Sequence, residues 1–244
     1  MNNYKTVFFA IGVLLIILGA FMLIPFFIQF IYGEENNIFL SSAAVTVFIG
    51  ILLVLTNLEE NRKLNLQQAF LLTALSWLSI AIFGCIPFLL SNLNLSFVDA
   101  FFESMSGITT TGSTIITDLD NTPKSILIWR AILQWLGGIG IIVMAITILP
   151  LLNIGGMQLF RMETSDTAEK ILPKTREITL IISIIYLTLT FVCGLAYWIV
   201  GMNIFDSIAH SMTTIATGGF STYSSSIGYF QSPKIEIVSI IFMI

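Results

Sequence analysis

The stretch SGITTTGST, Ser106 to Thr114, places three threonines directly before a glycine. It lies in a chain of 244 residues of which 56% are hydrophobic and only 10% are charged, whereas soluble domains carry about 25% charged residues. This composition indicates a protein of the lipid bilayer. At membrane depth, a polar and flexible backbone segment is tolerated where it is buried in protein or lines a water-filled path.

Apolar stretches of membrane-spanning length surround this segment. About 20 apolar residues cross the hydrocarbon core. Five stretches reach that length: Val7–Tyr32, Ile38–Thr56, Ala69–Leu90, Ser125–Leu152 and Ile178–Met202. A sixth begins after Pro233 and is still apolar at Ile244. We therefore expect an all-α integral membrane protein.

The basic residues are distributed unevenly among the gaps between these stretches. Cytoplasmic segments of membrane proteins carry an excess of Lys and Arg. Seven of the ten basic residues lie before the first stretch, between the second and third, or between the fourth and fifth: Lys5, Arg62, Lys63, Arg161, Lys170, Lys174 and Arg176. We expect the N-terminus and these two loops to face the cytoplasm.

Two further apolar stretches are too short to span the bilayer. Phe97–Ile108 and Ile204–Ala216 have about a dozen residues each, which is typical of re-entrant helices. Each ends at a loop rich in threonine and glycine. Each also has an aspartate near its start, Asp99 and Asp206, which we expect to cap the helix because its charge suits the positive end of the helix dipole.

The two short segments match when they are aligned at an offset of 107 residues. The identical pairs are Asp99 with Asp206, Ser104 with Ser211, Met105 with Met212, Ile108 with Ile215, Thr110 with Thr217, and Gly112 with Gly219. Both loops then lead through a Pro-Lys pair into a further apolar stretch. The order of span, short helix, polar loop and span thus occurs twice, as in many transporters and channels.

Such loops have the chemistry of an ion filter. The C-terminus of a re-entrant helix is its negative dipole end and favours a cation. Rings of backbone carbonyls replace the hydration shell of potassium in known filters. No formal charge occurs between Ser104 and Thr117. A single threonine and glycine cluster is more often a turn, but two at matching positions favour a filter.

The sequence contains few residue patterns that would indicate an enzyme. The single histidine, His210, and two distant cysteines, Cys85 and Cys193, cannot supply the ligand set of a zinc site. Because both cysteines lie in predicted helices, we interpret them as packing residues rather than as a disulfide. The nucleophile-elbow, Walker and zinc-protease motifs do not occur in the sequence.

A few polar or flexible residues interrupt the apolar stretches. Glu103, in the first short helix, and Arg130, near the outer end of the fourth span, are functional candidates because buried charges are costly in lipid. The alternative is a structural ion pair that holds the loop, which we favour because Glu103 would face away from an ion path. His210 aligns with Glu103; we expect it to pack or to form hydrogen bonds, and the alternative is an ion ligand. The run Gly137-Gly138-Ile139-Gly140 predicts a bend or a close-packing point.

Three stretches resemble the Trk/Ktr/HKT superfamily of potassium transporters, in particular the TrkH/TrkG type of bacterial Trk systems. They are ITTTGST (108–114), WRAILQWLGGIGIIVMAITILPLLNIGGMQLFR (129–161) and FDSIAHSMTTIATGGFSTYSSSIGYFQSP (205–233). The resemblance implies two leading helices followed by four M1-P-M2 repeats, each similar to a potassium-channel subunit. It also implies a multi-pass protein of the bacterial inner membrane.

Site residues and partners follow from the same resemblance. Gly112 and Gly219 would be filter glycines, and the carbonyl donors beside them would come from Thr109, Thr110, Thr111, Ala216, Thr217 and Gly218. Potassium would be the transported ion, with no further cofactor. The expected partners are a cytosolic nucleotide-binding regulatory subunit of the TrkA type and a second copy of the full-length chain, with no nucleic acid.

The chain holds fewer repeats than the resemblance implies. Residues 1–64 are expected to form the two-helix segment, 65–152 one complete repeat, and 153–244 a cytoplasmic loop and a second repeat truncated in its last helix. We therefore expect an N-terminal half of a potassium-uptake protein that does not conduct by itself. A non-conducting regulatory or scaffolding membrane protein derived from this family is the alternative.

Overall fold

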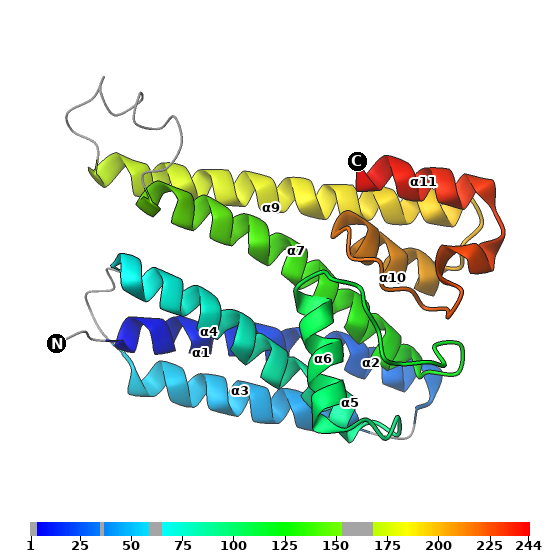
Figure 1. The fold of residues 1–244 in the computed structure, drawn as a ribbon, viewed down its shortest axis with the longest axis horizontal. Helices are drawn as coiled ribbons and strands as arrows, with labels where there is room; N and C mark the ends of the chain where they lie inside the picture. The colour runs from blue at the N-terminus through cyan, green and yellow to red at the C-terminus, as the bar shows by residue number, and fades with distance from the viewer. Residues whose placement is uncertain (1–3, 35–36, 59–64, 153–167) are drawn as a thin grey trace.

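The computed structural model describes residues 4–34, 37–58, 65–152 and 168–244 (Figure 1). Within these ranges every regular element is a helix and no strand occurs. The elements are α1 (Lys5–Phe21), α2 (Leu23–Tyr32), α3 (Ile38–Thr56), α4 (Leu66–Gly84), α5 (Ile86–Leu90), α6 (Phe97–Ile108), α7 (Lys124–Leu152), α9 (Ala168–Ile199), α10 (Ile204–Ile215), the 3-10 helix η1 (Ser226–Phe230) and α11 (Pro233–Met243).

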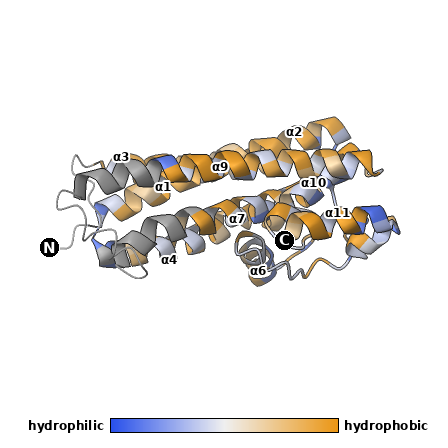
Figure 2. Cartoon of the chain, turned by 90° about the horizontal axis from the view of Figure 1, so that it is seen from above, coloured by the Kyte–Doolittle hydropathy of each residue, from blue (hydrophilic) through white to orange (hydrophobic). Residues whose placement is uncertain are grey.

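Five helical segments are long and apolar enough to cross a membrane. They are Lys5–Tyr32, Ile38–Thr56, Gln67–Leu90, Lys124–Ile142 and Glu177–Ile199. Figure 2 shows them hydrophobic along most of their length. The first span is divided at Met22 into α1 and α2, three residues before Pro25, which has no backbone N–H to donate to the preceding turn. The prediction of an all-α membrane protein with five complete spans is confirmed.

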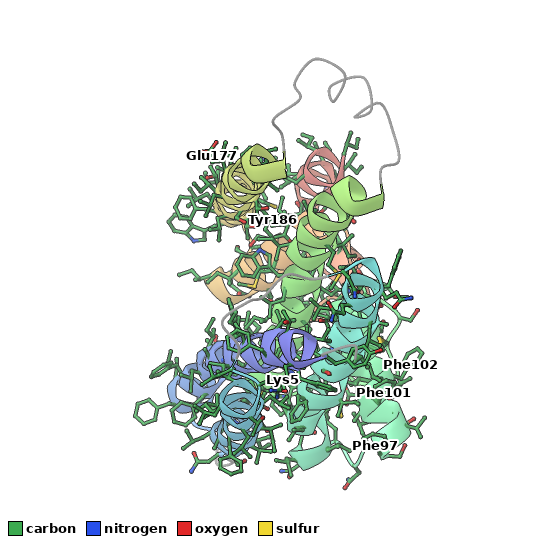
Figure 3. All side chains as sticks on the ribbon, turned by 90° about the vertical axis from the view of Figure 1, so that its left-hand side faces the viewer. Lys5, Phe97, Phe101, Phe102, Glu177 and Tyr186 are labelled. Carbon is green, nitrogen blue, oxygen red and sulfur yellow. The ribbon has the colours of Figure 1, made fainter. Side chains whose placement is uncertain are left out.

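Helix α7 lies between the N-terminal helices and the pair α9 and α10 (Figure 1). Toward the N-terminal helices, the indole of Trp129 is fully buried and donates a hydrogen bond of 3.0 Å to the carbonyl of Gly84 at the end of α4. Toward α9, the hydroxyl of Tyr186 donates to the carbonyl of Trp135 at 3.0 Å, and Tyr186 points between the two helices in Figure 3. Both halves of the structure are thus tied to α7.

The helix ends that border the basic segments lie together. The start of α1, the end of α3, the start of α4, the end of α7 and the start of α9 all lie at one end of the molecule, on the left in Figure 1. This agrees with the expectation that these segments share one side of the membrane. Arg62, Lys63 and Arg161 themselves lie outside the described residues, and the cytoplasmic assignment of that side stays a prediction.

The two short helices occur where the sequence predicted them, but their caps differ from the prediction. The N-cap residues are Ser96 for α6 and Asn203 for α10. Asp99 and Asp206 lie three residues later, and their backbone N–H groups bond to the cap side chains at 3.2 and 2.8 Å. Asp99 also accepts from the hydroxyl of Ser96 at 2.7 Å. The aspartates therefore occupy the third helical position, as the acid of a capping box does, and still meet the positive helix end.

Two glycines in the middle of α7 receive the ends of both short helices. A side-chain carbon at Gly137 would overlap the carbonyl oxygen of Ile108, the last residue of α6. A side-chain carbon at Gly138 would lie 3.2 Å from the Cα of Ala216, which caps the end of α10. Gly137 and Gly138 therefore form a close-packing point. Because they are adjacent in α7, the C-termini of α6 and α10 contact neighbouring positions of this helix.

We predict that Gly137→Ala destabilises the fold by about 1–3 kcal/mol, because the added methyl meets backbone that must shift. Gly140→Ala is the matched control: Gly140 belongs to the same run but not to the close-packing point, since among the described residues no atom beyond its own helical turn lies within 4 Å of its added carbon. It should be neutral or stabilising, because alanine favours the helix by about 1 kcal/mol. Thermal unfolding of the purified protein in detergent measures both. Equal midpoints for the two variants would contradict the close-packing assignment.

Candidate functional site

The backbone leaves both short helices in the same way. At the end of α6, the N–H groups of Thr110 and Thr111 donate to the carbonyls of Gly107 and Ser106, both at 3.0 Å. At the end of α10, the N–H groups 107 positions later make the equivalent bonds: Thr217 to Thr214 and Gly218 to Thr213, both at 2.9 Å. This pair of bonds is the Schellman arrangement of a helix C-terminus.

Dihedral angles repeat at the same offset. Thr110 and Thr217 have φ of 56° and 49°, and Gly112 and Gly219 have φ of 78° and 80°. A positive φ is unusual for a β-branched residue, whereas glycine adopts it without a steric cost. Two loops that share hydrogen bonds and dihedral angles at every one of these positions have the same local structure. The alignment seen in the sequence therefore corresponds to a real structural equivalence.

The two loops touch one another. A side-chain carbon at Gly112 would overlap the carbonyl oxygen of Gly218 and would lie 3.6 Å from the Cα of Gly219. Only a residue without a side chain fits at Gly112 while the second loop stays in place. The expectation that the glycines of the two loops approach each other is met.

Exposed polar atoms gather where the loops meet. Thr111, Thr217 and Gly219 are exposed, whereas Ala216 and Gly218 are buried. The hydroxyls of Thr109 and Thr111 lie 2.8 Å apart. In the described part of the chain, no hydrogen-bond donor contacts the carbonyls of the four residues Thr109 to Gly112. Uncharged oxygens at the negative ends of two helices are suited to a cation that gives up part of its hydration shell.

Glu103 supports the first loop through hydrogen bonds to residues after Gly112. Its carboxylate accepts hydrogen bonds from the hydroxyl of Thr114 at 2.9 Å and from the N–H of Ile115 at 3.0 Å. It also forms an ion pair with the Nε of Arg130 at 2.7 Å, and both side chains are at most 1% exposed. Its neighbour Phe102 is exposed on the outer side of α6 (Figure 3). The carboxylate thus has the position that a structural ion pair requires.

Arg130 connects this pair to the second loop. Its Nη1 donates to the carbonyl of Ser221 at 2.9 Å, and its guanidinium lies 4.0 Å from the ring centroid of Phe220. Phe220 is buried and reaches Gly107 of α6. One cation on α7 therefore holds the first loop through Glu103 and the second loop through a backbone carbonyl.

Gln134 is a site residue that the sequence analysis missed. Its Nε2 donates to the carbonyl of Gly218 at 2.7 Å, and its Oε1 accepts from the N–H of Phe220 at 3.0 Å. The side chain is fully buried. Two signals point to it in the sequence: an amide inside an apolar span is unusual, and Gln134 follows Arg130 by four residues, on the same face of the helix.

Helix α10 supports the second loop with other residues. The carboxylate of Asp206 accepts from the hydroxyl of Thr222 at 2.7 Å and from that of Tyr223 at 2.9 Å. Burial, together with the bond to Asp206, raises the pKa of the Tyr223 phenol, so this hydroxyl stays protonated and continues to donate. His210 lies 3.1 Å from the hydroxyl of Ser221. This contact occupies the place that Glu103 and Thr114 occupy in the first loop.

The described residues define an all-helical membrane protein in which two loops with uncharged oxygens face each other. Residues 34–244 match the model of the TrkH family, described as a cation transport protein, and the chain belongs to this family. The members it resembles are transport proteins, so the family is one of transporters rather than of enzymes.

Individual relatives agree with this assignment. The chain is 40% identical to the Trk system potassium uptake protein TrkH of Vibrio parahaemolyticus, over 99% of this chain and 51% of the relative. It is 34% identical to TrkG of Escherichia coli K12, over 98% and 50%. The crystal structure of the potassium transporter TrkH from Vibrio parahaemolyticus superimposes with a TM-score of 0.88 at 39% identity, over 99% of this chain and 49% of that one. The chain spans about half the length of these relatives.

We predict that Glu103→Gln lowers the free energy of unfolding by about 3–5 kcal/mol, because it leaves the charge of Arg130 buried without a counter-ion. The double variant with Arg130→Met should lose less than the sum of the two single variants. Glu236→Gln, on an exposed position of α11, is the control and should change stability by no more than about 0.5 kcal/mol. Denaturant titration in detergent measures all four proteins, and strictly additive losses would contradict the coupling.

Proposed function

We propose that this chain belongs to the pore-forming subunit of a Trk-type potassium uptake system and that its two loops line the ion path. The filter residues are then Thr109, Thr110, Thr111, Gly112, Ala216, Thr217, Gly218 and Gly219. The observation that carries the proposal is that two uncharged loops of the same backbone structure meet at the ends of two short helices. The printed names of the relatives as potassium uptake proteins support potassium as the ion.

The loops have the physical properties that such a path needs. A potassium ion must lose water to enter a narrow path, and carbonyl and hydroxyl oxygens replace that water without binding the ion too tightly. A formal negative charge at the loop would hold the ion more strongly. The carboxylates near the loops are instead directed to structural partners, Glu103 to Arg130 and Asp206 to Thr222 and Tyr223.

The proposal includes an arrangement in repeats. Residues 1–64 form a leading helix pair, and residues 65–152 form an M1-P-M2 unit from α4 and α5, α6 and α7. Residues 153–244 contain the elements α9, α10 and α11 of a second unit. Each unit contributes one loop to the path, and the conducting protein brings together four such loops. Both units use α7, since its two glycines contact the ends of both short helices.

The proposed partners act from the cytoplasmic side. They are a nucleotide-binding regulatory subunit of the TrkA type and a second copy of the full-length protein, in the bacterial inner membrane. The N-terminus and the basic loops then face the cytoplasm.

An impermeant thiol reagent added to intact cells should label a cysteine placed at Asn36 and leave one at Thr167 unlabelled. The reverse labelling pattern would overturn this orientation.

We predict that Gly112→Ser and Gly219→Ser both reduce the preference for potassium over sodium in the full-length protein, because a side chain disfavours their positive φ. The effect should be larger for Gly112→Ser, whose added atoms also meet Gly218. Gly228→Ser is the control, since its added carbon has no neighbour within 4 Å. Competition of sodium with rubidium uptake in cells that lack other potassium uptake measures the preference. Wild-type competition in both loop variants would refute the filter assignment.

A further inference from the structure

Gln134 holds the backbone on both sides of Gly219. Its amide donates to the carbonyl of Gly218 and accepts from the N–H of Phe220, so one side chain binds the two peptide groups that flank the glycine. The side chain is fully buried and packs so closely on Gly218 that a side-chain carbon there would overlap it. The amide of Gln134 thus acts as a clamp on this part of the second loop.

The clamp determines where the carbonyl of Gly219 points. In a trans peptide the C=O and the N–H point in opposite directions, and none of the described peptide bonds is cis. Because the N–H of Phe220 points at Gln134, the carbonyl of Gly219 in the same peptide group points away from α7. Gly219 itself is exposed. The carbonyl of Gly218 is turned toward Gln134, and its oxygen lies against Gly112 of the first loop.

The first loop lacks a clamp of this kind. Within the described ranges, no side chain bonds the peptide groups on either side of Gly112. The side chains that support the first loop bond to residues after Gly112. Ser106 donates to the carbonyl of Ser113 at 2.6 Å, and Glu103 accepts from Thr114 and Ile115. The orientation of the peptide groups around Gly219 therefore depends on Gln134 in a way that has no counterpart at Gly112.

We propose that Gln134 is a positioning residue for ion selectivity, an inference that rests on the proposed function. It directs the carbonyl of Gly219 toward the ion and reserves the carbonyl of Gly218 for a structural bond. Glycine by itself does not keep one peptide orientation, since it adopts positive and negative φ about equally well. Without the amide, the peptide groups around Gly219 would rotate more freely, and the oxygen cage would fit sodium and potassium more equally.

The test compares ion selectivity in full-length protein reconstituted into liposomes. Gln134→Met keeps the volume of the side chain and removes both hydrogen bonds. Gln134→Asn keeps an amide that is one methylene too short to reach both peptide groups. We expect each variant to reduce the ratio of potassium to sodium uptake about tenfold, since two net hydrogen bonds correspond to roughly this factor.

Two further variants make the result decisive. Thr190→Val removes the acceptor of the Trp135 indole, a bond of 3.0 Å between α7 and α9 that does not involve the loops, and it should leave the ratio unchanged. Gly219→Ser tests the filter itself. A normal ratio in both Gln134 variants, with a reduced ratio in Gly219→Ser, would overturn the clamp and leave the proposed function standing. A normal ratio in Gly219→Ser and in both Gln134 variants would overturn the clamp and the proposed filter function together.

Discussion

Arg130 carries its charge within an apolar span at 1% exposure, and Glu103 is its counter-ion at 2.7 Å. Removing either partner from such a pair leaves an uncompensated buried charge. The pair also has a geometric role, because the carboxylate accepts from the first loop and the guanidinium donates to the carbonyl of Ser221 in the second. The ion pair between α6 and α7 therefore links both loops to α7 and helps to fix their relative position.

Close approach of the backbones makes that interaction possible. Gly137 and Gly138 let α6 and α10 end directly against the middle of α7, and Gly112 lets the two loops touch. Backbone groups at this depth cannot rely on water, so each loop needs partners from protein. Arg130 and Gln134 supply them one helical turn apart on the same face of α7. Among the described residues, the carbonyls of Thr109 to Gly112 in the first loop remain without a donor.

Much of this fold could be predicted from the sequence. Length and hydropathy were sufficient to predict the five spans and the short helices α6 and α10, because a helix of 12 residues is too short to cross the hydrocarbon core. The caps were predicted three residues too late, since the position of an aspartate does not show whether it precedes the helix or bonds back from its first turn. The contacts of Gln134 could not be predicted, because they join residues more than 80 positions apart and depend on the direction of single peptide groups.

The central claim is that the two loops that meet beside α7 hold the transported cation. Diffraction from crystals of the full-length protein grown with thallium, a potassium substitute with strong anomalous scattering, tests it most directly. The account predicts anomalous peaks within coordination distance of the oxygens of residues 109–112, 216, 217 and 219. Peaks elsewhere in the protein, with none beside these loops, would contradict it.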